Sequence, residues 1–248
     1  MLWQIVLLTF SSGVLSLGGG LFLIFRKRWN ESFVLKLTSF AAGVLLSTAF
    51  LDLLPEANIH IQESGKGDVF LPTLGGMILF FLLERSLLWY HHHHTAHDIK
   101  PTIWMVTFGD GFHNLIDGVA ISTSFLLNPA LGVTTAIAIA AHEIPQEIAD
   151  FGILLSGGLT KWRAIAFNLV TTLTALIGAI ITYYFAPQIR PFLGVLTAFT
   201  AGMFSYIALS DLIPELHRTK GQKDTVPQVV AFLLGIIMIG VFKSLTGV

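Results

Sequence analysis

Apolar stretches of around twenty residues, separated by short polar breaks, recur along the whole chain. A helix needs about 20 apolar residues to cross a bilayer, and these stretches are continuously apolar, whereas strands of a membrane barrel alternate at every second position. The pattern predicts an all-α integral membrane protein that forms a single transmembrane domain over residues 1–248. The eight predicted membrane-spanning helices cover residues 2–25, 33–54, 70–90, 102–127, 131–156, 162–185, 189–213 and 226–246.

Composition and charge agree with this prediction and set an orientation. The chain is 54 % hydrophobic and 12 % charged, and it lacks cysteine, which excludes a disulfide scaffold and a thiolate metal site. With the N-terminus outside, the inner loops hold most of the lysines and arginines, so both termini are predicted outside. The first apolar run has no positive leader and is predicted to remain as a helix. Short loops without a transit peptide favour a bacterial inner membrane with periplasmic termini.

Residues 42–57, AGVLLSTAFLDLLPEA, match residues 201–216, AGMFSYIALSDLIPEL, at an offset of 159. Because spans two and seven cross in opposite directions, we expect spans 1–3 and 6–8 to form an inverted repeat around spans 4 and 5. This 3+2+3 arrangement is typical of secondary transporters. The repeat also predicts an acidic mouth at each side of the membrane, although charged helix ends before a proline are an alternative interpretation. The mouth residues are Asp52 and Glu56 outside, and Asp211, Glu215 and His217 inside.

Spans four and five carry acids that no basic side chain offsets. Between Lys100 and Lys161 there is no lysine or arginine. An ionised acid near the bilayer centre costs about 3 kcal/mol, so a bound metal cation is the simplest counter-charge. A membrane protein built around such a cation is expected to move it. The five carboxylates in this segment are Asp110, Asp117, Glu143, Glu147 and Asp150.

Helical spacing places further ligand types beside these acids. His113 and Asp117 are four residues apart, as are His142 and Gln146, so each pair shares one helix face. Imidazole, carboxylate and amide ligands suit Zn²⁺, with Fe²⁺, Mn²⁺ and Cd²⁺ as alternatives. Asp110 and Asp150 are interpreted as acceptors that orient a ligand histidine. The predicted metal ligands are His113, Asn114, Asp117, His142, Glu143, Gln146 and Glu147, with Asn168 either a further ligand or a packing contact.

A histidine-rich segment lies between spans three and four, within a predicted cytoplasmic loop over residues 91–101. A short tract of this kind is either a weak metal trap or a solvated loop with little effect on transport. Its histidines are His91, His92, His93, His94 and His97.

The motifs HNLIDG in span four and HEIPQE in span five resemble the signatures of the ZIP (Zrt/Irt-like) metal transporters, close to the branch with an HExPHE-type signature. The repeated DL[LI]PE and the eight predicted spans fit as well. The resemblance implies uptake of divalent metal, chiefly zinc as substrate, toward the cytoplasm by an elevator-type motion of spans 1, 4, 5 and 6. It implies a first metal on His113, Asp117, His142 and Gln146, and a second on Asn114, Asp117, Glu143 and Gln146 with help from Asn168.

One departure from the family pattern concerns the second metal. Gln146 stands where the family often has glutamate or histidine, and a neutral amide bridges two cations poorly. Glu147 resembles the final glutamate of the HExPHE branch and is expected to compensate.

Two rival functions use the same residues. A metal-selective channel is the closer alternative to a carrier. An intramembrane zinc metalloprotease is the other, because HEIPQ superficially resembles the HExxH motif. Gln146 replaces the second histidine of that motif, and proteolysis explains neither the repeat nor the acidic mouths, so the chain is predicted not to be an enzyme. The expected partners are divalent metal ions and the lipid bilayer, with a homodimer left open and no nucleic acid.

Overall fold

The computed structural model describes residues 1–24, 31–65, 67–93, 99–156, 158–217 and 222–246. These residues form helices joined by short turns and contain no strand, which confirms the predicted all-α class. The helices are α1 (Leu2–Ile24), α2 (Glu31–Ser47), η1 (Thr48–Leu53), α3 (Leu54–Ser64), α4 (Phe70–His93), α5 (Ile99–Leu127), α6 (Pro129–Ser156), α7 (Lys161–Tyr184), α8 (Ala186–Ile189), η2 (Arg190–Phe192), α9 (Leu193–Tyr206), η3 (Ile207–Leu212), α10 (Ile213–His217) and α11 (Gln222–Thr246).

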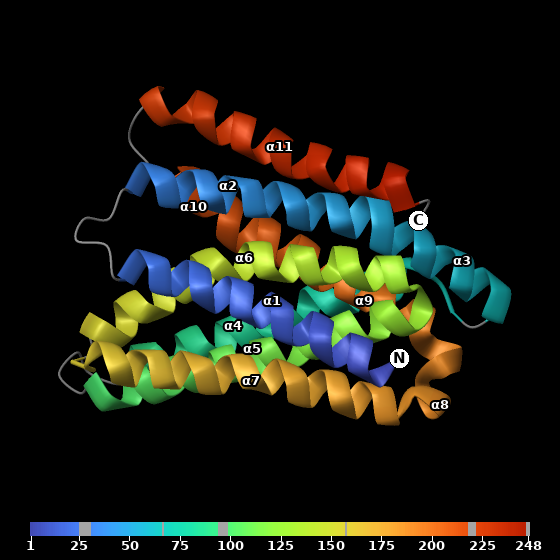
Figure 1. Ribbon diagram of the computed structural model, residues 1–248, viewed down its shortest axis with the longest axis horizontal. Coiled ribbons are helices and arrows are strands. Elements are labelled where there is room, and N and C mark those ends of the chain that lie inside the picture. Colours follow the sequence, from blue (N-terminus) through green and yellow to red (C-terminus); the bar gives the residue numbers. More distant parts are fainter. Residues whose placement is uncertain (25–30, 66, 94–98, 157, 218–221, 247–248) are drawn as a thin grey trace.

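The long helices run side by side along the long axis of the molecule and alternate in direction (Figure 1). α2, η1 and α3 follow one another without a break, as do α8 to α10, so the described residues make eight long helical passes. α1 begins and α11 ends at the same end of the bundle (Figure 1), which is called the N–C end below. The other end is called the opposite end.

Membrane character is visible in the helices and in their surface. Among the described residues, five helical segments are long and apolar enough to cross a membrane: Leu2–Gly19, Ser32–Ser64, Lys161–Tyr184, Ala186–His217 and Thr225–Leu245. They coincide with five of the eight predicted spans. Large apolar side chains such as Leu15, Ile177 and Ile237 are exposed, while many serines and threonines are buried. This distribution suits a lipid environment, in which an apolar exterior costs nothing.

The helices pack as two groups. α1, α5, α6 and α7 contact one another, and α2, α4, α9 and α11 form the second group through the pairs α2–α11 and α4–α9. The groups meet where α6 packs on α2 and α5 packs on α9. α5 and α6, which carry the predicted metal ligands, therefore lie at the junction between the groups.

The repeated DL[LI]PE motif adopts the same local structure twice. The π-helical turns η1 and η3 lie 159 residues apart, and each precedes a proline, Pro55 or Pro214. Proline has no N–H to donate to the carbonyl four residues earlier, so the helix widens locally. In both copies an i to i−5 bond follows: Leu54 N–H to Ala49 O, and Ile213 N–H to Ala208 O. The sequence repeat is thus also a structural repeat.

Two close helix crossings involve residues that are related by the same offset of 159. A Cβ placed on Gly43 would lie 2.1 Å from the carbonyl oxygen of Phe232, and one on Gly202 would lie 1.9 Å from that of Thr73. A second glycine stands at each crossing. A Cβ on Gly235 of α11 would lie 2.4 Å from a carbonyl oxygen of α2, and one on Gly76 of α4 would lie 2.0 Å from a carbonyl oxygen of α9. These four positions need glycine because the two backbones touch there. The repeat therefore extends beyond residues 42–57 and 201–216 into α4 and α11.

A Gly235→Ala chain is expected to lose thermal stability, whereas Gly240→Ala on the same helix is expected to keep it. A Cβ at position 235 would lie 2.4 Å from the carbonyl oxygen of Phe40, while nothing lies within 4 Å of one at position 240. Overpacking of this kind typically costs about 1–3 kcal/mol. Thermal unfolding of the purified chain in detergent measures the difference. Equal melting temperatures for the two variants would contradict the close crossing of α2 and α11.

Two predicted boundaries are wrong. The second span was predicted to end at residue 54, but the helix continues through α3 to Ser64 because Ala57 and Ile61, one turn apart, are buried where α3 packs on α9. The histidine-rich loop was predicted to start at residue 91, but α4 continues to His93. His94 and His97 lie outside the described residues.

Candidate metal centre

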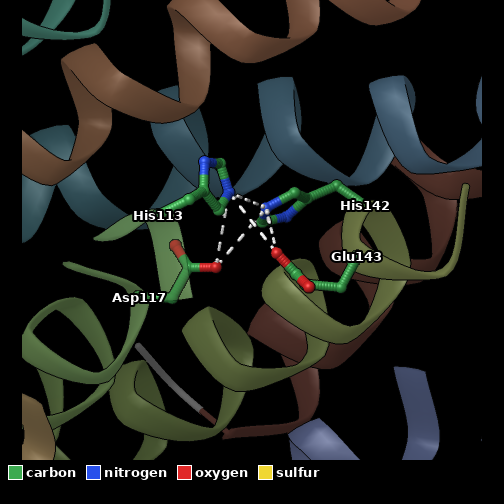
Figure 2. A group of neighbouring side chains, drawn as sticks. All are labelled: His113, Asp117, His142 and Glu143. Carbon is green, nitrogen blue, oxygen red and sulfur yellow. Dashed lines mark hydrogen bonds and ion pairs between the residues drawn. The ribbon is translucent and has the colours of Figure 1, made fainter. Parts of the chain in front are cut away.

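Four side chains from α5 and α6 converge on one point between the two helices (Figure 2). His113 and Asp117 come from consecutive turns of α5, and His142 and Glu143 are neighbours on α6. Each residue offers one ligand atom, and the four atoms all lie within 4.8 Å of one another. They are the only described histidine, cysteine, aspartate or glutamate side chains that meet in such a group.

Five of the six separations between these atoms are close to those of tetrahedral coordination. Nε2 of His113 lies 3.2 Å from Nε2 of His142, 3.6 Å from Oδ2 of Asp117 and 3.4 Å from Oε1 of Glu143. Nε2 of His142 lies 3.6 Å from the Asp117 oxygen and 3.8 Å from the Glu143 oxygen. Zinc bonds of about 2.0–2.2 Å in a tetrahedron place ligand atoms about 3.3–3.6 Å apart. One ion fits at the centre with small side-chain adjustments.

The cluster is buried, and its acids lack partners. His142 is 0 % exposed, Asp117 1 % and Glu143 2 %. All four oxygens of Asp117 and Glu143 are without a hydrogen bond. Buried carboxylates are normally paired or bound to metal, because an unpaired buried charge is strongly destabilising. The arrangement therefore calls for a cation.

The two histidines are oriented by the helices around them. Nδ1 of His142 lies 3.0 Å from the carbonyl oxygen of Ala138, so it carries the proton and donates it there. This tautomer leaves Nε2 with a lone pair that faces the cluster. The rings of Phe80 from α4 and Phe204 from α9 pack edge-on against His113 and His142, respectively. The second group of helices thus covers the cluster with aromatic side chains.

The surroundings of three further predicted ligands differ from one another. Glu143 stands beside the histidines, and Gln146, four residues after His142, is half-buried. Asn114 is turned toward Asp110, and its Nδ2 donates to the Asp110 Oδ1 at 2.9 Å and to the Asp110 carbonyl at 3.1 Å.

Asp110 is not the acceptor for His142, whose Nδ1 faces the backbone carbonyl of Ala138. Asp110 instead accepts from Asn114, one turn along the same helix. The backbone carbonyl was not foreseen because a helical histidine reaches it only when its ring turns back along the helix.

Glu147 and Asn168 are both buried, and Glu147 is not one of the four converging residues. Glu147 is 1 % exposed, and its Oε1 accepts from the hydroxyl of Thr172 on α7 at 3.2 Å. Asn168 is 2 % exposed, and its Nδ2 has no hydrogen-bond partner. Thr172 was not predicted, since a threonine in an apolar helix carries no signal of its own.

The predicted mouths lie at opposite ends of the bundle in different surroundings. Asp52 of η1 is fully buried, and Nζ of Lys243 lies 3.7 Å from its Oδ1. Glu56 of α3 accepts a 3.4 Å hydrogen bond from Asn128. At the opposite end, Asp211, Glu215 and His217 are exposed on η3 and α10. Lys243 was missed by the sequence analysis.

Comparison with known proteins identifies the fold family. A family model described as the ZIP zinc transporter matches residues 3–102 and 90–243, nearly the whole chain. The chain belongs to the ZIP family. The resemblance of the HNLIDG and HEIPQE motifs to this family is thereby confirmed, and the motifs contribute the four converging residues of the metal centre.

Several named ZIP relatives share parts of the chain. Zinc transporter ZIP13 of Pongo abelii is 30 % identical over 220 residues, which cover 84 % of this chain and 66 % of that protein. Zinc transporter ZIP10 of Homo sapiens is 38 % identical over 135 residues, or 52 % of this chain and 16 % of ZIP10. Zinc transporter foi of Drosophila melanogaster is 37 % identical over 141 residues, or 56 % and 20 %. The chain spans a fifth or less of ZIP10 and foi.

Proposed function

We propose that the chain is a divalent metal transporter that carries zinc into the cytoplasm through the cluster between α5 and α6. The observation that carries this proposal is the set of four converging ligand atoms, three of them on buried side chains and two of them carboxylate oxygens without a hydrogen bond. The names of the ZIP relatives support zinc as the substrate. By ligand type, Fe²⁺, Mn²⁺ and Cd²⁺ are the other candidates.

A carrier fits this geometry better than the metal-selective channel. The five measured separations between ligand atoms are 3.2–3.8 Å, which suits a dehydrated ion held by side chains. An ion held by four ligands leaves slowly unless the surrounding helices rearrange. Rapid conduction instead requires binding weak enough to permit escape.

An inverted repeat around α5 and α6 is supported by the pairing of contacts. The α2–α11 contact has its counterpart in α9–α4, and the α1–α6 contact has its counterpart in α7–α5. Gly19 faces Ile144, and Gly178 faces Leu115. Gly178 comes 159 residues after Gly19, and Ile144 comes 29 residues after Leu115, so the two contacts are equivalent. The same offset of 29 separates the two histidines of the cluster. We therefore place the metal on the pseudo-two-fold axis of a 3+2+3 arrangement.

The proposed motion is of the elevator type. All four ligands belong to the group formed by α1, α5, α6 and α7, so this group would slide past α2, α4, α9 and α11 with the ion bound. The charge of the loops supports an orientation with the N–C end outside. The bacterial inner membrane stays a prediction, as does the homodimer. The relatives named above come from animals.

Zinc uptake into proteoliposomes tests the proposal. We expect His113→Ala and His142→Ala each to reduce uptake by more than about a hundredfold, since loss of even an outer partner of a metal ligand costs about 10–100-fold. Phe112→Ala is the matched control, because Phe112 neighbours His113 but is 48 % exposed and is not among the converging residues. Saturable uptake that survives in both histidine variants would refute the proposal. Non-saturating flux in the native chain would favour a channel.

A further inference from the structure

A lysine from the last helix neutralises the buried acid at the N–C end of the bundle. Nζ of Lys243 on α11 lies 3.7 Å from Oδ1 of Asp52 and donates a 2.6 Å hydrogen bond to the carbonyl oxygen of Leu51. That carbonyl lacks its usual helical donor, because the residue four positions later is Pro55. The widened turn η1 therefore offers one carbonyl and one carboxylate, and both are engaged by the same ammonium group.

Asp52 is a poorly satisfied carboxylate despite this contact. It is 0 % exposed, and neither of its oxygens accepts a hydrogen bond. A buried carboxylate whose ion pair spans 3.7 Å can bind a stronger cation, since a divalent ion carries twice the charge and approaches to about 2.0–2.2 Å. η1 packs against α6, which bears His142, so a cation at Asp52 lies beside the helix that leads to the centre.

The structural repeat offers a direct comparison. The position related to Lys243 by the offset of 159 is Glu84 on α4, at the opposite end of the bundle. Glu84 accepts a 2.5 Å hydrogen bond from the hydroxyl of Tyr206, one turn before Asp211. Two positions that are equivalent by symmetry thus carry opposite charges. The N–C end has a cation beside its acid, and the opposite end has a second acid.

We propose that Lys243 is a tethered cation that competes with the metal for Asp52 and so lowers the affinity of the N–C end for an incoming divalent ion. The inference rests on the proposed function only for its consequence in transport. Because two cations within about 4 Å of each other repel, the ammonium must leave Asp52 when a metal ion binds there. The chain then binds metal weakly where it enters, while the opposite end has no such competitor at the equivalent position.

Transport kinetics give the first test. In proteoliposomes with the N–C end facing outward, Lys243→Met and Lys243→Gln are expected to lower the KM for zinc about tenfold, the effect of removing about 1.4 kcal/mol of competition. The glutamine variant retains a donor for the Leu51 carbonyl, so it separates the charge from the hydrogen bond. Lys36→Met on α2, at the opposite end, removes the same charge elsewhere and should leave KM unchanged. An unchanged or higher KM in both Lys243 variants would overturn the inference.

Zinc binding to the purified full-length chain gives a test that needs no transport. In a His142→Ala background, which weakens the central cluster, Lys243→Gln is expected to tighten the residual zinc binding about tenfold. Adding Asp52→Asn should cancel that gain. A gain that persists without Asp52, or no gain at all, would contradict the proposal. If binding responds as expected but the native chain takes up no zinc, the inference stands and the transport function fails.

Discussion

An Asp117→Asn chain is expected to lose zinc uptake by more than about a hundredfold while remaining as thermally stable as the native chain without zinc. Oδ2 of Asp117 lies 3.6 Å from Nε2 of both histidines, so, like Oε1 of Glu143, it is an anionic atom close to both helices of the site. Asparagine has nearly the same shape and removes a buried carboxylate that has no hydrogen-bond partner. The fold therefore does not depend on the charge, whereas the bound ion does.

Thermal unfolding with and without zinc separates these two effects. A ligand present at a hundred times its Kd stabilises the native state by about 2.7 kcal/mol, and this increment should vanish in the variant. Asp68→Asn is the control, because Asp68 is exposed and its Oδ1 accepts hydrogen bonds from the backbone of Phe70 and Leu71, which asparagine can also do. Normal zinc uptake by the Asp117→Asn chain would place the transport path elsewhere.

Glu143→Gln is expected to abolish zinc binding at the centre, whereas Gln146→Ala is expected to weaken it less than about tenfold. Oε1 of Glu143 lies 3.4 Å and 3.8 Å from the two histidine nitrogens. Gln146 is a half-buried neutral amide, which attracts a divalent cation less strongly than a carboxylate does. The two substitutions lie on the same face of α6, one turn apart, so each is the matched control for the other.

Zinc titration of the purified chain, followed by calorimetry, measures both affinities directly. The reverse ranking, with Gln146→Ala the more damaging change, would favour the ligand set implied by the family resemblance. Equal losses would mean that Gln146 joins the ion once it is bound, with Glu143 retained as the charged ligand. The experiment therefore decides which of the two α6 side chains completes the first site.

Local geometry explains why much of the centre could be predicted. His113 and Asp117 meet because residues four apart on a helix always share a face. The same reasoning placed His142 and Gln146 on one face of α6, and the widened turns before Pro55 and Pro214 follow from proline chemistry. None of these features depends on how the helices are arranged around one another.

The choice between Glu143 and Gln146 depends on another level of structure. Both lie close to His142 on one side of α6, and how near each side chain comes to α5 is set by the rotation of α6 about its axis. That rotation is determined by packing, as where Gly19 of α1 lies against the side chain of Ile144 on α6. The sequence pattern alone contains no measure of it.

The sequence by itself determined the apolar helices, the repeat and the ligand types, because helix formation and transfer into lipid depend on local composition. The tertiary structure decided that Glu143 joins the two histidines and that Lys243, 191 positions after Asp52, neutralises that acid. Contacts between distant helices depend on their depth, rotation and crossing distance. The packing of the helix backbones sets those quantities, and it exists only in the folded chain.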